Sequence, residues 1–171
     1  MEAVKDELYD LFKEHKTSHF IETGSYEGHS IARALDIGYN RIYSCEINLD
    51  RYNDCLDKFH RNENVLLYYG DSLHALPLML KDIDQKCTFW LDAHRSGISR
   101  DCPTLEELKI IGQHHIKDHT ILIDDVSDFG TEAHEGITIL DLQMEILKIN
   151  KHYIFSYIDT CKPNNVMICK V

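Results

Sequence analysis

The chain has 171 residues, with 18 Lys and Arg against 29 Asp and Glu, a formal charge of −11 at pH 7. This charge argues against a protein that binds the phosphate backbone of nucleic acids. Hydrophobic residues make up 43 % of the chain and charged residues 27 %, which is typical of an ordinary globular protein. Since a chain of this length can bury roughly 70 % of its unfolded surface, we expect one domain over residues 1–171.

The apolar runs are too short for a membrane span, and residues 1–16 mix acids and bases without the apolar stretch of a secretory signal. We therefore expect a cytoplasmic protein with no membrane partner. The 6 cysteines stand singly, with no Cys-x-x-Cys pair. We expect reduced thiols rather than a zinc or disulfide framework.

The first predicted element is an amphipathic helix over about residues 3–15, because apolar residues recur there with helical spacing. Short apolar runs bounded by Gly, Asn or Asp then predict buried strands. These runs cover residues 19–22, 41–46, 64–69, 87–92 and 120–124. Helical patterns separate them, with apolar faces at Ile31, Ala34 and Leu35; Leu49, Tyr52, Leu56 and Phe59; Leu73, Leu76 and Leu80; and Leu105, Leu108 and Ile111.

A last helix, with Ile137, Leu140, Met144 and Leu147 on its apolar face, precedes two strands at about 152–158 and 165–170. Repeated alternation of strand and helix indicates a doubly wound parallel sheet. The closing pair of strands predicts a hairpin, which adds one antiparallel strand. The expected fold is therefore α/β, a Rossmann-like doubly wound sheet of seven strands, mostly parallel, with one antiparallel strand from the C-terminal hairpin.

Polar residues follow the predicted parallel strands, and ligands of such sheets bind outside the carboxyl ends of the strands. The first strand leads into the glycine-bearing turn Glu22-Thr23-Gly24-Ser25-Tyr26-Glu27-Gly28, which lets the backbone approach a ligand. Glu46 ends the second strand, where an acid can accept hydrogen bonds from ribose hydroxyls. The later strands end in Gly70-Asp71-Ser72, Asp92-Ala93-His94-Arg95 and Asp124-Asp125. The alternative is that each acid caps the following helix, as Asp71 in particular could.

Three carboxylates at adjacent strand ends, Asp92, Asp124 and Asp125, would repel one another unless a cation neutralises them. Oxygen ligands favour Mg²⁺, with Mn²⁺ or Ca²⁺ as alternatives, and an octahedral ion would keep positions for substrate hydroxyls. The 11 histidines invite a zinc interpretation. However, we expect the adjacent His114 and His115 to be surface residues at the end of a helix.

Taken together, these motifs resemble a class I methyltransferase that depends on S-adenosylmethionine (SAM). Within that superfamily, the turn from Glu22 to Gly28 resembles the opening motif of macrocin-type sugar O-methyltransferases, where an aromatic residue replaces the middle glycine. Those enzymes also carry an Asp after the fourth strand and an Asp-Asp pair after the fifth, which together hold a divalent metal. The resemblance covers residues 20 to about 129, although this chain lacks their long N-terminal lid region.

The resemblance implies a SAM-dependent, divalent-metal-dependent O-methyltransferase that acts on a sugar or glycan hydroxyl. The Gly24 turn would cradle the methionine part of SAM, Glu46 would hold the ribose, and Asp71 would face the adenine amino group. The implied cofactor-binding residues are Glu22, Thr23, Gly24, Ser25, Tyr26, Gly28, Ser30, Glu46, Asp71, Ser72 and Asp92.

Catalysis would depend on His94 as general base and on Asp92, and Mg²⁺ would be held by Asp92, Asp124 and Asp125. The acceptor would be a small molecule or glycan with neighbouring hydroxyls, clamped by loops 95–102 and 126–135. A catechol or phenol O-methyltransferase and a noncatalytic SAM-binding module are the alternatives. The oligomeric state stays open, with a homodimer as one outcome.

Overall fold

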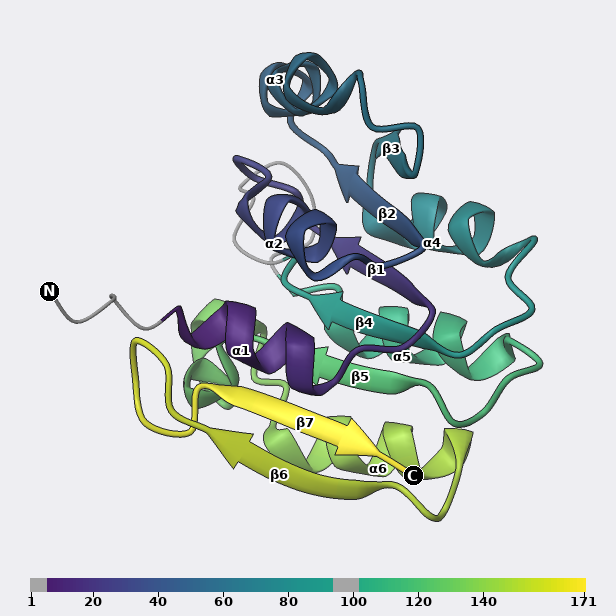
Figure 1. The fold of residues 1–171 in the computed structure, drawn as a ribbon. Helices are drawn as coiled ribbons and strands as arrows, with labels where there is room; N and C mark the ends of the chain where they lie inside the picture. The colour runs from purple at the N-terminus through teal and green to yellow at the C-terminus, as the bar shows by residue number, and fades with distance from the viewer. Residues whose placement is uncertain (1–5, 94–101) are drawn as a thin grey trace, which may run out of the picture.

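The protein is described by a computed structural model that covers residues 6–93 and 102–171. Its strands form a seven-stranded sheet in the order β3-β2-β1-β4-β5-β7-β6, with helices on both faces (Figure 1). The parallel strands that precede the hairpin are β1 (His19–Thr23), β2 (Arg41–Glu46), β3 (Val65–Tyr69), β4 (Cys87–Leu91) and β5 (Thr120–Ile123). β7 (Val166–Lys170) runs antiparallel to both β5 and β6 (Ile154–Ile158). This confirms the predicted Rossmann-like α/β sheet with one antiparallel strand.

Six α-helices alternate with the strands in the described ranges, and two short 3-10 helices follow β5. They are α1 (Glu7–Glu14), α2 (His29–Ile37), α3 (Leu49–Phe59), α4 (Ser72–Leu80), α5 (Thr104–Gln113), η1 (Val126–Asp128), η2 (Glu132–His134) and α6 (Ile139–Ile149). Helices α1, α2 and α3 pack on one face of the sheet, and α4, α5 and α6 pack on the other. No helix within the described ranges is long and apolar enough to cross a membrane.

Local capping explains where several helices begin and end. The side chain of Asn48 accepts from the backbone at the start of α3, and that of Asp71 does the same for α4. A capping box joins Thr138 and Asp141 at the start of α6. Gly38 ends α2 with φ 82°, a conformation that glycine adopts without a steric cost.

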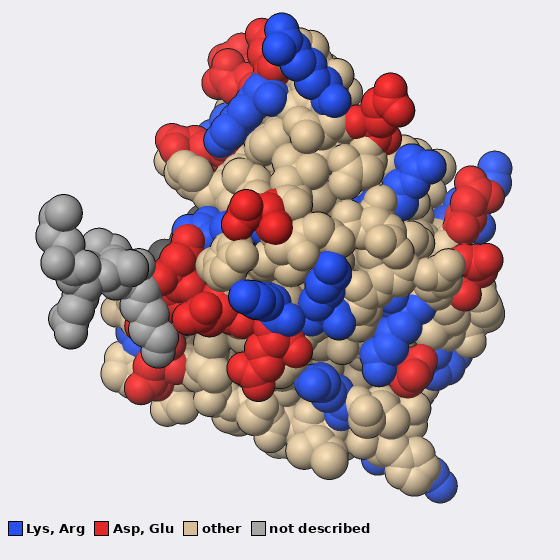
Figure 2. Space-filling model, viewed as in Figure 1, with Lys and Arg blue, Asp and Glu red and all other residues tan. Residues whose placement is uncertain are grey.

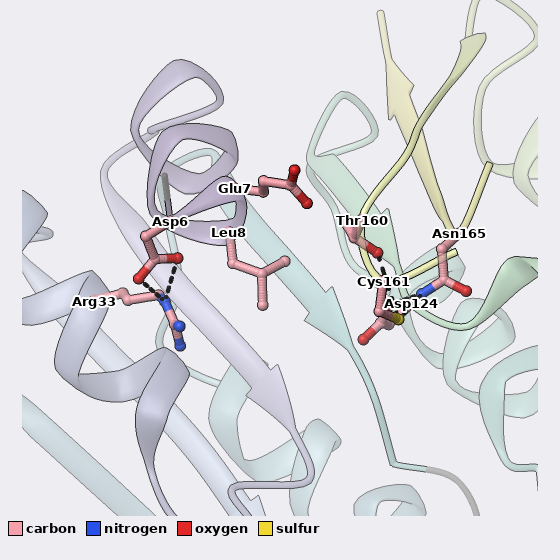
Figure 3. A pocket seen from close by; sticks show the side chains of 8 residues that line it. All are labelled: Asp6, Glu7, Leu8, Arg33, Asp124, Thr160, Cys161 and Asn165. Carbon is pink, nitrogen blue, oxygen red and sulfur yellow. Dashed lines mark hydrogen bonds and ion pairs between the residues drawn. The ribbon is translucent and has the colours of Figure 1, made fainter. Parts of the chain in front are cut away.

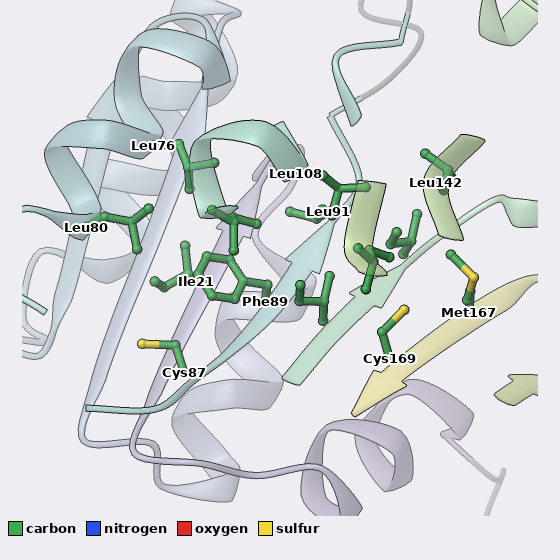
Figure 4. Packing of buried hydrophobic residues seen from close by; sticks show 14 of the residues in the cluster. Ile21, Leu76, Leu80, Cys87, Phe89, Leu91, Leu108, Leu142, Met167 and Cys169 are labelled. Carbon is green, nitrogen blue, oxygen red and sulfur yellow. The ribbon is translucent and has the colours of Figure 1, made fainter. Parts of the chain in front are cut away.

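Two hydrophobic clusters lie on the two faces of the sheet because neighbouring strand residues point to opposite sides. On β1, Phe20 packs with the cluster under α1–α3, while Ile21 packs with the cluster under α4–α6. Figure 4 shows this second cluster, in which Leu76, Leu108 and Leu142 from three successive helices meet the sheet. Helices therefore cover both faces of the sheet, and the loops lie at the ends of its strands.

The buried face of α6 differs from the predicted one. Leu142 and Ile146 are fully buried, whereas Leu140, Met144 and Leu147 are 62 %, 54 % and 39 % exposed. The helix carries apolar residues on two faces, and helical periodicity cannot tell which one faces the sheet.

The face predicted for α3 is also only partly right. Cys55 and Phe59 are buried, while Leu49 and Leu56 are exposed. Phe59 is held inward by the β1–α2 turn, since its ring lies directly beside Gly28.

A series of buried hydrogen bonds joins elements at the amino ends of the strands. The N–H of Cys87 donates to Nδ1 of His119 (3.1 Å), so a neutral His119 carries its proton on Nε2. That nitrogen lies 2.9 Å from Nδ1 of His114, whose Nε2 lies 3.1 Å from the carbonyl oxygen of Ile83. Burial lowers the pKa of both rings, that of His119 to about 4. The expectation of a surface His114 was wrong, because this ring turns inward, and only His115 is exposed.

Candidate functional site

The predicted site residues gather at the edge of the sheet where the parallel strands end. The register pairs Thr23 of β1 with Cys45 of β2 and with Leu91 of β4, and it pairs Leu91 with Ile123 of β5. The loops that follow these strands therefore leave the sheet side by side. This is the edge at which open parallel sheets bind ligands.

The β1–α2 turn is shaped by three residues in the left-handed region: Gly24 (φ 88°), Tyr26 (φ 48°) and Gly28 (φ 73°). A Cβ atom on Gly24 would lie 2.8 Å from the carbonyl oxygen of Asp92, and one on Gly28 would lie 2.6 Å from the Phe59 ring. Both glycines are thus required by the chain's own packing, because the turn lies against the end of β4 on one side and against α3 on the other. The expectation that Gly24 serves backbone approach to a ligand stays a prediction.

Glu22 lies buried at the end of β1, 1 % exposed. Its Oε2 accepts a hydrogen bond from Oγ of Ser44 (2.6 Å), and this hydroxyl lies 2.6 Å from Oγ of Ser25. Burial raises the pKa of Glu22 to about 7, and hydrogen bonds from Ser44 and Ser30 oppose part of that rise. The carboxyl group therefore changes protonation state near neutral pH.

Glu46, the last residue of β2, is hydrogen-bonded to the backbone of the β1–α2 turn. Its Oε2 accepts from the N–H of Tyr26 and its Oε1 from the N–H of Asn48, both at 2.8 Å. The Tyr26 ring is 52 % exposed and lies under the guanidinium of Arg51, 4.3 Å from the ring centre. Glu46 thus fixes the backbone of an aromatic residue that occupies a glycine-like conformation.

The remaining predicted cofactor residues lie at the ends of β1 and β3 and at the start of α4. Asp71 caps α4 through a bond from the N–H of Leu73 (2.8 Å), while its predicted role toward the adenine stays a prediction. Ser72 begins α4 and is buried. Thr23 is fully buried, and its Oγ1 has no hydrogen-bond partner among the described residues.

The acids predicted to hold a metal follow β4 and β5. The N–H of Asp124 donates to the carbonyl oxygen of Leu91 (3.2 Å), so Asp92 and Asp124 leave neighbouring strands at matched positions. Asp125 has φ 50°. Carboxylate oxygens are the ligands that Mg²⁺ prefers, so this donor set fits the ion chemically. Within residues 6–93 and 102–171, however, no three His, Cys, Asp or Glu side chains come together as a metal-binding group.

Asn165, which lies at the start of the predicted strand 165–170, joins two of these acids. Its Nδ2 donates to Oδ1 of Asp124 (3.0 Å) and to Oδ1 of Asp125 (3.3 Å). It comes from the end of the β6–β7 loop, far from both acids in the sequence. Only the hairpin topology, which places β7 beside β5, could have pointed to this contact.

A pocket of about 530 Å³ opens beside Asp124 (Figure 3). Its other walls come from the start of α1, from Arg33 on α2 and from the β6–β7 loop. The lining residues are Asp6, Glu7, Leu8, Arg33, Asp124, Thr160, Cys161 and Asn165. Arg33 donates from Nε to both carboxylate oxygens of Asp6 (2.9 Å each). Acidic side chains also gather over α1 on the face shown in Figure 2, so the pocket opens in acidic surroundings.

The predicted base His94 and most of the predicted clamp loop 95–102 lie outside the described residues. The second clamp loop, 126–135, contains η1 and η2. His134 is the histidine of this second loop and would be the next candidate for the base if His94 is not the base. It has no exposed surface, and its ring centre lies 4.4 Å from that of Phe129. A substrate could not reach His134 in this conformation.

No protein-family model and no curated protein matches this sequence. Solved structures do match. An O-methyltransferase from Bacillus cereus in complex with S-adenosylhomocysteine (SAH) superposes with a TM-score of 0.63 at 12 % identity, over 96 % of this chain and 78 % of that chain. TomG, an O-methyltransferase of tomaymycin synthesis from Streptomyces achromogenes in complex with SAM, gives 0.63 at 11 % identity, over 96 % and 77 %.

A third structure, a provisionally assigned caffeoyl-CoA O-methyltransferase from Staphylococcus aureus, gives a TM-score of 0.67 at 14 % identity, over 98 % of this chain and 84 % of that chain. Likeness at such low identity establishes architecture rather than activity. The chain therefore has the Rossmann-like methyltransferase fold.

Proposed function

We propose that this protein is a SAM-dependent, divalent-metal-dependent O-methyltransferase that acts on a sugar or glycan hydroxyl. The observation that carries the proposal is the contact between the β1–α2 turn, where the cofactor would bind, and the residue that follows β4, where the predicted acids begin. The Gly24 turn lies against the backbone of Asp92, and Asp124 leaves the next strand at the matched position. A cofactor at the turn and an acceptor at the acids would be neighbours.

The SAH and SAM complexes of the Bacillus cereus and Streptomyces achromogenes proteins support a cofactor of this kind for the fold. In this chain, Glu22, Glu46 and the serines around them hold the turn in a fixed shape. Such preorganisation lowers the entropy cost of aligning two substrates. The proposed SAM site thus consists of a rigid turn from β1 and acids from β2 and β3.

In the proposed reaction, an acceptor hydroxyl oxygen attacks the methyl carbon of SAM. The carbon–sulfur bond breaks, its electron pair stays on sulfur, and the hydroxyl proton passes to His94. Mg²⁺ or Mn²⁺, held by Asp92, Asp124 and Asp125, would supply a lower hydroxyl pKa and a fixed orientation of two acceptor oxygens. The pocket beside Asp124 is open to an acceptor of small-molecule size.

A catechol or phenol acceptor is the second candidate, since its neighbouring hydroxyls offer the same pair of oxygens. The likeness to the Staphylococcus aureus protein, provisionally assigned to caffeoyl-CoA, favours this alternative. A noncatalytic SAM-binding module is the third.

Transfer of labelled methyl from SAM to sugar diols and to catechols tests these alternatives directly. We expect transfer to at least one sugar acceptor, its loss in excess chelator and its return with Mg²⁺ or Mn²⁺. Asp124→Asn and Asp125→Asn should weaken metal binding while SAM still binds. Full activity in excess chelator would refute the metal, and transfer to catechols alone would select the second candidate. SAM binding without any transfer would favour the noncatalytic module.

A further inference from the structure

Helix α6 carries an apolar stripe that does not contact the sheet. Leu140, Met144 and Leu147 follow one another at intervals of four and three residues, the spacing that places side chains on one face of a helix. All three are exposed, by 62 %, 54 % and 39 %, although their spacing predicts a buried face. Single exposed apolar residues are ordinary, but neighbouring ones on one helix face are typical of a contact surface.

The opposite side of α6 accounts for its packing within the chain. Leu142 and Ile146 are fully buried in the cluster beneath α4, α5 and α6, and α5 packs beside α6 (Figure 1). The amide of Gln143 donates to the hydroxyl of Tyr157 on β6 (2.9 Å), which helps to fix the rotation of α6 on the sheet. Turning the stripe inward would expose Leu142 and Ile146 in exchange. The fold of one chain therefore cannot cover both apolar faces of this helix.

The charged side chains beside the stripe have opposite signs at its two ends. Asp141 lies in the first turn of α6 and Lys148 in the last turn. They are seven residues apart, close to two full turns, so they lie on the same side of the stripe. Lys148 also pairs with Glu145 (2.7 Å), but its side chain is 67 % exposed, so a second acid can reach it. The stripe is thus bordered by an acid at one end and a base at the other.

This arrangement is complementary to itself. If a second α6 ran antiparallel across the stripe, its Lys148 would lie beside Asp141, and its Asp141 would lie beside Lys148. Met144 lies between these two residues in the sequence, so the two Met144 side chains would meet at the centre. A contact across a two-fold axis uses the same patch on both copies, and each attractive pair occurs twice.

We propose that α6 is an interaction surface for the α6 of a second copy of this chain, which packs antiparallel to it across a two-fold axis. Leu140 of each copy packs against Leu147 of the other. Because α6 has 11 residues and is about 16 Å long, the contact belongs to the small, weak class of interfaces, and the dimer should dissociate on dilution. The inference is independent of the proposed function, since none of these residues belongs to the candidate site.

Analytical ultracentrifugation of the full chain over a range of concentrations tests the proposal. We expect wild type to pass from monomer to dimer as its concentration rises. Met144→Lys places two like charges at the axis, so this variant should stay monomeric, with a wild-type circular dichroism spectrum because Met144 is exposed. Leu78→Lys is the matched control, since Leu78 is 59 % exposed on α4, outside the stripe, and it should dimerise as wild type does.

Two further variants test the antiparallel orientation. Lys148→Gln removes the attraction to Asp141 of the second copy and should weaken the dimer by about 2- to 10-fold. Lys148→Glu places two acids together and should weaken it further. A parallel pair of helices would instead bring the two Lys148 side chains together, so a stronger dimer of Lys148→Gln would overturn the orientation.

Three outcomes would overturn the contact itself. They are a wild type that stays monomeric up to its solubility limit, a Met144→Lys variant that dimerises as wild type does, and an equal loss of the dimer in Leu78→Lys. Binding of a monomeric wild type to anionic lipid vesicles, abolished in Met144→Lys, would assign the stripe to a membrane surface instead.

Discussion

The carboxyl ends and the amino ends of the strands, called here the carboxyl edge and the amino edge of the sheet, differ in backbone strain and in charge. Among the described residues, every residue with a left-handed φ except Gly38 lies in a loop at the carboxyl edge or in the β6–β7 loop beside it. The same edge carries half-buried acids. At the amino edge, His114 and His119 instead form a buried series of bonds with well-matched donors and acceptors.

We propose that the strained carboxyl edge is shaped for a ligand and the amino edge for stability. Strained backbone and clustered like charges cost free energy and persist where function uses them. A buried, satisfied network stabilises a fold and offers nothing to a ligand.

The largest expected effect is on the chemistry of the carboxyl edge, at His94. An unperturbed imidazole titrates near ~6.5 and can accept the hydroxyl proton at neutral pH. His94→Ala should lower the methyl-transfer rate by ~10²-fold or more, with SAM and metal affinities nearly intact. His94→Gln is the control for hydrogen bonding without proton transfer. If both variants keep normal turnover and the wild-type pH profile, another group is the base.

The second effect belongs to the amino edge and appears in stability. Because burial holds the pKa of His119 at about 4, below the unfolded value of 6.5, the folded state favours the neutral ring. Its contribution to stability is therefore present above pH 6.5 and is lost as the pH falls toward 4. Between these values the free energy of unfolding should decrease by roughly 2 to 3 kcal/mol from this ring.

Urea unfolding at a series of pH values measures this loss. In His119→Asn, Oδ1 can still accept from the N–H of Cys87, and the side chain does not titrate, so the pH dependence should become flatter. His74→Asn changes an exposed histidine and should leave the wild-type slope. An unchanged slope in His119→Asn would contradict the proposed role of the neutral ring.

The smallest expected effect is the difference in stability between alanine variants of two glycines with nearly equal φ angles. Gly24 (φ 88°) would place a Cβ 2.8 Å from the Asp92 oxygen, while Gly130 (φ 89°) would place one in open space. Both alanine variants should lose about 1 to 2 kcal/mol from the left-handed conformation. Gly24→Ala should lose a further ~1 to 3 kcal/mol from crowding. Equal melting temperatures for the two variants would show that a Cβ at Gly24 does not clash with the backbone after β4.

Much of the fold follows from local patterns. The spacing of apolar runs gives the strands to within one or two residues, because each buried parallel strand is bounded by polar turn residues. The capping residues Asn48 and Asp71 mark the starts of α3 and α4 in the sequence itself. The acids at the carboxyl edge are visible for the same reason, since they follow directly after the strands.

What escapes prediction depends on contacts between distant segments. The buried face of α6 is chosen by its packing on α5 and the sheet, although both faces carry apolar residues. His114 is buried because its hydrogen-bond partners come from other segments. They are His119, directly before β5, and the carbonyl oxygen of Ile83, in the loop between α4 and β4. Asn165 reaches acids about forty residues earlier, a contact that requires the completed hairpin.

The most direct test of the account is calorimetric titration of the wild-type protein with SAM, with SAH and with NAD. The proposed function predicts one SAM per chain at low-to-mid micromolar affinity, similar binding of SAH, and a raised melting temperature with either ligand. Tight binding of NAD with no heat from SAM would contradict it and would assign the carboxyl edge to a nicotinamide cofactor.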